Sequence, residues 1–210
     1  VPTILIKNNI DAAVHSLKDI PVEYSKKLYL VAISERVDAE DVLYHPQGLS
    51  INKLPSGSVI GTCSLRRRGQ IINLRKDVLI KDIRGNIQTR IDKVHTGEYD
   101  ATILAAAGLI RLGYDISKYY VFDFDEITPA PGQGALAVET RRDNKKLIEI
   151  ISQIDNLNIR KAVEVERSIL QHIGASCSVP VGVFATSTDE GIDIVACHVN
   201  PNTGDKIVVR

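Results

Sequence analysis

The alternation of strand-like and helix-like segments between residues 58 and 112 constrains the fold most strongly. Each short apolar segment is followed by a segment with the spacing of an amphipathic helix. The pairs are 59–60 with 65–75, 78–83 with 86–95, and 101–104 with 105–112. This order is typical of right-handed βαβ units on a parallel sheet, so we predict an α/β fold.

The segments on either side of this region add strands and then a different pattern. Further strands are predicted at 12–15, 28–33, 41–45 and 135–138, and helices at 144–154 and 158–173. The last part alternates like antiparallel strands separated by turns, at 181–186, 192–199 and 207–209. We therefore expect the chain to end in a small α+β unit with an antiparallel sheet.

The composition excludes several classes of protein. The 26 Lys and Arg residues balance 26 Asp and Glu residues, and aromatic residues make up only 5%, which argues against a nucleic-acid or membrane-surface binder. No apolar run approaches the roughly 20 residues that span a bilayer. Three cysteines without metal-ligand spacing predict neither a disulfide framework nor a metal site, and favour a cytoplasmic protein. The absence of Met and the opening in mid-pattern suggest an internal piece of a longer protein.

Arginines cluster at the first strand-to-helix junction, Gly61–Arg68. Thr62 and Ser64 are good N-cap residues there. Arginines in a first helical turn oppose the helix dipole, so they favour a site where an anionic ligand lies over the helix N-terminus. A solvated basic face is the alternative.

The same layout recurs at the next two junctions, where Arg84-Gly85 precedes Arg90, and Arg111 follows the third strand. The carboxyl ends of parallel strands meet at one edge of a sheet, where ligands bind. We therefore predict that five arginines converge on one crevice and bind a small polyanion; the alternative is a set of scattered surface arginines. These residues are Arg66, Arg67, Arg84, Arg90 and Arg111.

Two further segments carry reactive side chains. In the segment His15–Pro21, the carboxylate of Asp19 lies next to Lys18, so it could stay ionised and act on a proton or a developing cation. A simple turn before proline is the alternative. The segment Gly174–Pro180 places Cys177 among small residues, with room for a covalent adduct, although a loop cysteine is commonly inert.

Together these motifs make the chain resemble the porphobilinogen deaminase family, also called hydroxymethylbilane synthases, of tetrapyrrole biosynthesis. The resemblance covers essentially the whole chain, but the family's N-terminal segment and the end of its third domain are missing. Ala175-Ser176 departs from the glycine pair that usually precedes the family's cysteine. The motifs that carry the resemblance are residues 15–21, 61–67, 84–90, 131–134 and 177–180.

The resemblance implies three domains, of which the first two are built like periplasmic binding proteins around a cleft. The third is the small α+β domain with the antiparallel sheet. The implied boundaries are 1–34 with 134–153, 37–128, and 156–210.

The resemblance also implies an activity. The enzyme would be a transferase that condenses four porphobilinogen molecules head-to-tail into hydroxymethylbilane, with loss of ammonia. A dipyrromethane cofactor, bound through a thioether to Cys177, would prime the chain. The protein would be a cytoplasmic monomer without an obligate protein partner.

Residue roles follow from the same resemblance. Asp19 and Lys18 would be catalytic, and the arginines would bind carboxylates rather than stabilise the fold. Cofactor-binding residues would be Cys177, Ser16, Lys18, Asp19, Thr62, Ser64, Arg66, Arg67, Arg84 and Gly85. Substrate-binding residues would be Arg84, Arg90, Arg111 and Gln133. The alternative function is a periplasmic-binding-protein-like module for a polycarboxylate, which would explain the arginines but neither Cys177 nor a third domain.

Overall fold

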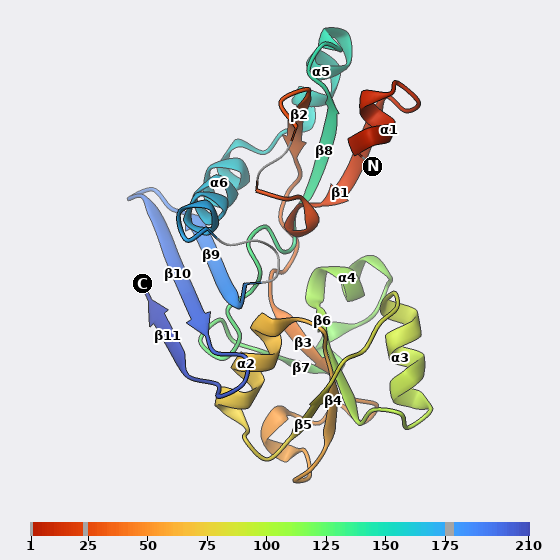
Figure 1. The fold of residues 1–210 in the computed structure, drawn as a ribbon, viewed down its shortest axis with the longest axis vertical. Coiled ribbons are helices and arrows are strands. Elements are labelled where there is room, and N and C mark those ends of the chain that lie inside the picture. The colour runs from red at the N-terminus through yellow and green to blue at the C-terminus, as the bar shows by residue number, and fades with distance from the viewer. Residues whose placement is uncertain (1, 23–24, 175–178) are drawn as a thin grey trace.

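A computed structural model describes residues 2–22, 25–174 and 179–210, and these residues form three separate sheets (Figure 1). Within the described residues, no helix is both long and apolar enough to cross a membrane. The helices are α1 Pro2–Ile6, α2 Leu65–Leu74, α3 Ile87–His95, α4 Ala106–Arg111, α5 Lys145–Ile151 and α6 Leu157–His172. The strands are β1 Ala12–Ser16, β2 Leu28–Ile33, β3 Asp41–Tyr44, β4 Val59–Gly61, β5 Leu79–Lys81, β6 Ala101–Ala105, β7 Tyr120–Val121, β8 Leu136–Arg141, β9 Val181–Ser187, β10 Ile192–Val199 and β11 Lys206–Val209.

The five-stranded sheet has the order β5-β4-β6-β3-β7 and lies in the lower half of Figure 1. Strand β4 pairs in parallel with β5 and β6, so the predicted βαβ units are confirmed. Strand β3 pairs antiparallel with β6 and β7. Ile71 of α2 packs into the core on one face, and Ile91 of α3 and Leu109 of α4 pack into the core on the other. Both faces are therefore covered, as the apolar strands require.

The N-terminal sheet has the order β1-β8-β2, with the late strand β8 between two early ones. Strand β8 is antiparallel to both neighbours. Helix α6 covers this sheet, and Val163 packs there against Ile33 and Ala137. Residues that are more than a hundred positions apart in the sequence therefore share one small core.

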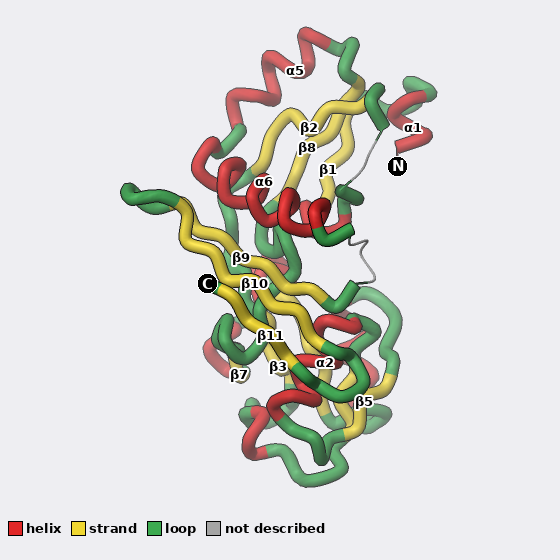
Figure 2. Tube along the Cα trace, turned by 60° about the vertical axis from the view of Figure 1, so that its left-hand side comes forward, coloured by secondary structure: helices red, strands yellow, loops and turns green. Residues whose placement is uncertain are grey.

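The C-terminal sheet β11-β10-β9 is antiparallel throughout, which confirms the expectation for this part of the chain. Figure 2 shows this sheet in front, with α6 above it and α2 beneath it. Gly69 allows the close approach of α2, because a Cβ there would lie 2.8 Å from the Val199 side chain. Helix α2, which begins at the arginine motif, is thus fixed between two sheets.

Two crossover segments, 34–40 and 128–135, link the N-terminal sheet to the five-stranded sheet. They run side by side, and the Val37 N–H donates to the Gly134 carbonyl at 3.2 Å. Arg36 of one crossover forms an ion pair with the fully buried Glu166 of α6, with Nη1 at 2.6 Å from Oε1. Glu166 also accepts from the backbone N–H groups of Gly132 and Ala185. This carboxylate therefore joins both crossovers and the C-terminal sheet.

Candidate active site

The arginine motif lies at the start of α2, directly after the carboxyl end of β4. Ser64 is the N-cap, and its Oγ accepts from the Arg67 N–H at 3.4 Å. The Thr62 hydroxyl accepts from the Ser64 N–H at 3.2 Å, so both predicted capping residues order this turn. Gly61 lies so close to Ile83 that an added Cβ would be 3.0 Å from it. The carboxyl end of β4, which precedes α2, is therefore packed closely against Ile83.

Arg66 and Arg67 share one buried carboxylate, that of Asp41 at the start of β3. Arg66 Nη2 lies 2.8 Å from Oδ2, and Arg67 Nη2 lies 2.7 Å from Oδ1. Each guanidinium also donates from Nη1 to a carbonyl, that of Thr128 for Arg66 and that of Ile103 for Arg67. The two arginines are 5% and 7% exposed. Both guanidiniums are therefore enclosed by contacts within the protein, and their role in ligand binding stays a prediction.

The charge balance of this group fixes the ionisation of Asp41. Burial alone would raise the pKa of Asp41, but the guanidiniums of Arg66 and Arg67 outweigh it, helped by hydrogen bonds from Arg67 and Gln133. The pKa of this carboxyl group is held well below its usual range, so Asp41 stays ionised. Two arginines and one carboxylate leave an excess of one positive charge at the crevice.

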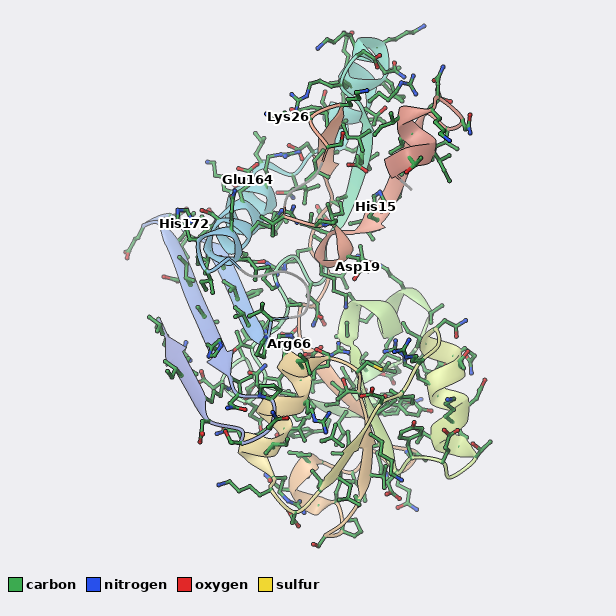
Figure 3. All side chains as sticks on the ribbon, in the orientation of Figure 1. His15, Asp19, Lys26, Arg66, Glu164 and His172 are labelled. Carbon is green, nitrogen blue, oxygen red and sulfur yellow. The ribbon has the colours of Figure 1, made fainter. Side chains whose placement is uncertain are left out.

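Lys18 and Asp19 lie in a single turn of 3-10 helix, Leu17–Asp19, directly after β1. Lys18 is partly buried, and its Nζ donates to Oε1 of Gln133 at 3.2 Å. The pKa of Lys18 is lowered to about 8, mainly by burial and also by the charges of Arg67 and Arg66, while Asp41 and Asp19 oppose the shift. Asp19 is exposed. Figure 3 shows Asp19 at the lower end of the upper part of the molecule, across from Arg66 at the start of α2.

Two cavities meet at these residues. The first has a volume of about 380 Å³, and the second about 350 Å³. Lys18, Asp19 and Arg67 line both of them. Among the described lining residues of the two cavities, Asp19 is the only acid. All the other charged side chains among these described lining residues are basic.

The first cavity collects residues from segments that lie next to each of the three sheets. From the predicted set it contains Ser64, Arg66 and Gln133, and from the C-terminal part Arg167, Leu170 and Val179. Arg167 of α6 donates to the carbonyls of Ile20 and Pro21, which follow Asp19 directly. The loop that carries Asp19 is thereby tied to α6.

The second cavity brings together the other two strand-to-helix junctions. Ser16, Gly85, Arg90 and Arg111 line it. Arg90 donates from Nε to the Gly85 carbonyl at 2.8 Å, and burial lowers the pKa of Arg90. Arg111 donates from Nη2 to the Gly134 carbonyl at 2.7 Å. The predicted convergence at the carboxyl ends of β4, β5 and β6 therefore holds for four of the five arginines.

Two residues of the predicted site are placed elsewhere by the structure, and one is not described. Of the described site residues, Thr62 and Arg84 line neither cavity. Thr62 is buried beneath the α2 turn, and Arg84 is exposed. Cys177 lies outside the described residues, and Val179, which lines the first cavity, is the nearest described residue after it.

Sequence reasoning missed the partners that hold the site together: Asp41, Arg36, Glu166 and Arg167. Asp41 stands in a charged stretch that also holds Glu35, Asp38 and Glu40, and nothing in the sequence singles it out. Glu166 lies in the long amphipathic helix α6, where a glutamate is expected on the solvent-facing side, so its burial was not predicted. The helical period does place Glu166 next to the buried Val163, three positions earlier, which was an unused signal of burial.

Comparisons with known proteins agree on one family. Residues 1–149 match the family described as "Porphobilinogen deaminase, dipyromethane cofactor binding domain", and residues 160–210 match "Porphobilinogen deaminase, C-terminal domain". The chain is 44% identical to a probable porphobilinogen deaminase of Nitrosopumilus maritimus, over 95% of this chain and 67% of that protein. It is 43% identical to the porphobilinogen deaminase of Geobacillus kaustophilus, over 94% of this chain and 64% of that protein.

The chain thus spans about two thirds of the length of these relatives. A solved structure of the methionine-binding protein MetQ aligns over 72% of each chain with a TM-score of 0.48 and 18% identity, a likeness too low to assign a function. The family assignment rests instead on the two matched regions and on the sequence identity to the curated relatives. This chain belongs to the porphobilinogen deaminase family.

Proposed function

We propose that this chain is the core of a hydroxymethylbilane synthase, which condenses four porphobilinogen molecules into hydroxymethylbilane with loss of ammonia. The observation that supports it best is the pair of cavities, where one exposed acid faces several cations. Porphobilinogen carries two carboxylates and a pyrrole N–H, so a growing chain of such units needs many cationic partners and one anionic one. The family membership supports the same reaction.

The residues of the first cavity fit a dipyrromethane cofactor. Arg67 Nε is buried without a hydrogen-bond partner among the described residues, which indicates an acceptor supplied by a ligand. Lys18, Ser64 and Arg66 would hold the cofactor's carboxylates beside it, and we propose that its thioether is made to Cys177. When bound, this group supplies the pyrrole carbon to which substrate units are added.

Asp19 is proposed to be the main catalytic residue. Its exposed carboxylate can accept hydrogen bonds from pyrrole N–H groups and stabilise the positive charge that develops as ammonia leaves. It can also take up the proton that is lost when the pyrrole ring regains its aromaticity. Lys18 next to it would orient a carboxylate, and Arg90 and Arg111 of the second cavity would bind those of the incoming substrate. The exposed Arg84 is proposed to contact substrate carboxylates from outside the cavities.

The remaining proposals concern organisation. The three sheets would mark three domains, with boundaries at 1–34 plus 134–153, 37–128 and 156–210. The protein would act as a cytoplasmic monomer, with porphobilinogen as its small-molecule substrate and no obligate protein partner.

The covalent cofactor provides the deciding experiment. A thioether survives thiol reductants, so reduced and denatured protein should still carry the added mass of two linked pyrrole units. Peptide mapping should place this mass on the fragment that contains Cys177. The Cys177→Ser variant should lack both the adduct and the turnover of porphobilinogen.

Cys63→Ser and Cys197→Ser are the matched controls. Cys63 is exposed and Cys197 is buried in β10, and neither lines the two cavities. Both variants should keep the adduct. Active protein with all three cysteines unmodified would overturn the proposal and favour a binding module.

A further inference from the structure

Asp41 is a fully enclosed charged group next to the site, and it lines neither cavity. It is 0% exposed. Its Oδ1 accepts from Arg67 Nη2 at 2.7 Å and from Gln133 Nε2 at 2.9 Å, and its Oδ2 accepts from Arg66 Nη2 at 2.8 Å. A buried carboxylate with three donors has a fixed orientation. It therefore also fixes the orientation of the three side chains that donate to it.

Arg66 and Arg67 have further N–H donors that these contacts do not use. A guanidinium has five N–H groups in a rigid plane. The contacts described for Arg66 and Arg67 use two each, on Nη1 and Nη2. Arg67 Nε remains buried and unpartnered among the described residues. Because the described contacts engage only Nη1 and Nη2, and both arginines line the first cavity, N–H groups remain to donate to a ligand there.

The same carboxylate reaches Lys18 through Gln133. Gln133 donates from Nε2 to Asp41 and to the Ala39 carbonyl, which leaves its Oε1 to accept from Lys18 Nζ. Asp41 thus orients the side-chain amide of Gln133, and this amide in turn orients the ammonium group of Lys18. Lys18 lies in the turn that follows β1, and the arginines lie in α2, so one buried acid contacts or reaches cations from two parts of the molecule.

We propose that Asp41 is a positioning residue, which orients Arg66 and Arg67 directly and Lys18 through Gln133, so that the three cations bind carboxylates of one ligand. The inference rests on the proposed function only in taking a polycarboxylate as the ligand. A purely neutralising role for Asp41 would predict the opposite outcome for ligand affinity. If Asp41 only offset the positive charge, its removal would make the site more cationic and tighten the binding of anions.

Binding of butane-1,2,3,4-tetracarboxylate separates the two roles. All variants carry Cys177→Ser, so that no thioether forms and the cations stay open to this probe. Titration calorimetry at pH 7 should show binding to the Cys177→Ser parent. Asp41→Asn should weaken it at least about tenfold although the site gains a positive charge, because misplaced binding groups lose most of their effect. Equal or tighter binding, or no binding to the parent, would overturn the inference.

Four further variants keep the test decisive. Asp41→Glu keeps the charge but shifts the carboxylate by one methylene, so it should also weaken binding. Asp77→Asn is the matched control, because Asp77 pairs with Arg75 on the surface and lies outside both cavities. It should leave the affinity unchanged within about twofold. If Asp41→Asn does not fold, Asp41→Asn with Arg66→Gln restores the charge balance; it should bind at least about threefold more weakly than Arg66→Gln alone, because Arg67 and Gln133 also lose their anchor.

A pH profile adds a readout that a structural role would not move. Asp41 and Asp19 face Lys18 as anions, and Arg66 and Arg67 face it as cations. Without the Asp41 charge, the loss of probe affinity at alkaline pH should begin at lower pH than in the parent. An unchanged profile would contradict the coupling. Turnover of porphobilinogen is measured on the chain that keeps Cys177. If this chain has no turnover while probe binding depends on Asp41, the proposed function alone is refuted. If turnover is normal while probe binding does not depend on Asp41, this inference alone is refuted.

Discussion

Two groups of arginines, alike in the sequence, differ in their surroundings. Arg66 and Arg67 follow β4 and are buried, paired with Asp41 and bonded to carbonyls of two other segments. Arg84 and Arg111 follow β5 and β6 and are exposed. The first pair is part of the protein's core, whereas the second group belongs to its surface.

The difference shows what strand-to-helix spacing can and cannot predict. Spacing places a side chain at one edge of a parallel sheet, because the carboxyl ends of the strands meet there. It does not say which strand supplies the partner. Asp41 comes from β3, which is antiparallel to β6 and enters the sheet from the crossover. We therefore expect the buried pair to affect both ligand binding and stability, and the exposed pair to affect stability less.

The largest effect is expected from the acid that faces both groups. Asp19→Ala should lower turnover by more than the roughly 10²–10⁴-fold of general acid–base catalysis, because charge stabilisation is lost as well. The variant should still fold, since Asp19 is exposed. Steady-state kinetics and a thermal melt test this. Turnover of Asp19→Ala within tenfold of the parent would contradict the catalytic role of Asp19. An arginine variant that is equally inactive with an unchanged KM would contradict the view that the arginines act only in binding.

Stability should separate the two groups of arginines next. Arg67→Leu leaves Asp41 with Arg66 and Gln133, so it should cost about 1.5–3 kcal/mol of the free energy of unfolding, the value of a hydrogen bond to a charged group. Arg84→Leu should cost less than about 0.5 kcal/mol, as is usual for exposed side chains. Urea unfolding of both variants measures the difference. Equal losses would mean that the burial of Arg67 contributes nothing.

A pH-dependent effect is expected from Lys18, the cation of the site whose pKa is lowered to about 8. Burial lowers the pKa of Lys18 to about 8 from an unfolded value of 10.5. Between these values the unfolded chain binds more protons, so the contribution of Lys18 to stability rises with pH, by at most about 1.4 kcal/mol per pH unit. Below pH 8 both forms are protonated and the contribution is constant. Lys18→Met should lose this rise relative to the parent, and parallel stability curves from pH 7 to 10.5 would contradict it.

Much of the fold could be predicted because it depends on local periodicity. The strand 28–33 and the helix that begins beside Ser64 follow from apolar spacing and a capping residue, both of which are local properties. β5 is shorter than predicted, Leu79–Lys81 in place of 78–83, and its two ends are exposed at the sheet edge. The two-residue strand β7 was not predicted, because so short a pairing depends on its neighbour β3.

The site could be predicted only in part. Lys18, Asp19, Arg67 and Gln133 were found from their motifs, and the structure brings them together at the cavities. The Asp41 carboxylate could not be found, because its importance comes from two side chains 25 and 26 positions away and from an amide 92 positions away. Contacts of this separation depend on the topology of the chain and leave no local pattern.

The central place of β8 in the N-terminal sheet has a consequence for folding on the ribosome. Strands β1 and β2 are not neighbours in that sheet, so neither can complete its backbone pairing until β8 has been made. Roughly a hundred residues separate β2 from β8, and their synthesis takes on the order of 5–20 s at typical rates. The strands of the five-stranded sheet lie between β2 and β8 in the sequence, so this sheet can form before β1 and β2 are fully paired. The lower half of the molecule should therefore acquire its structure first and serve as the base on which the upper half closes.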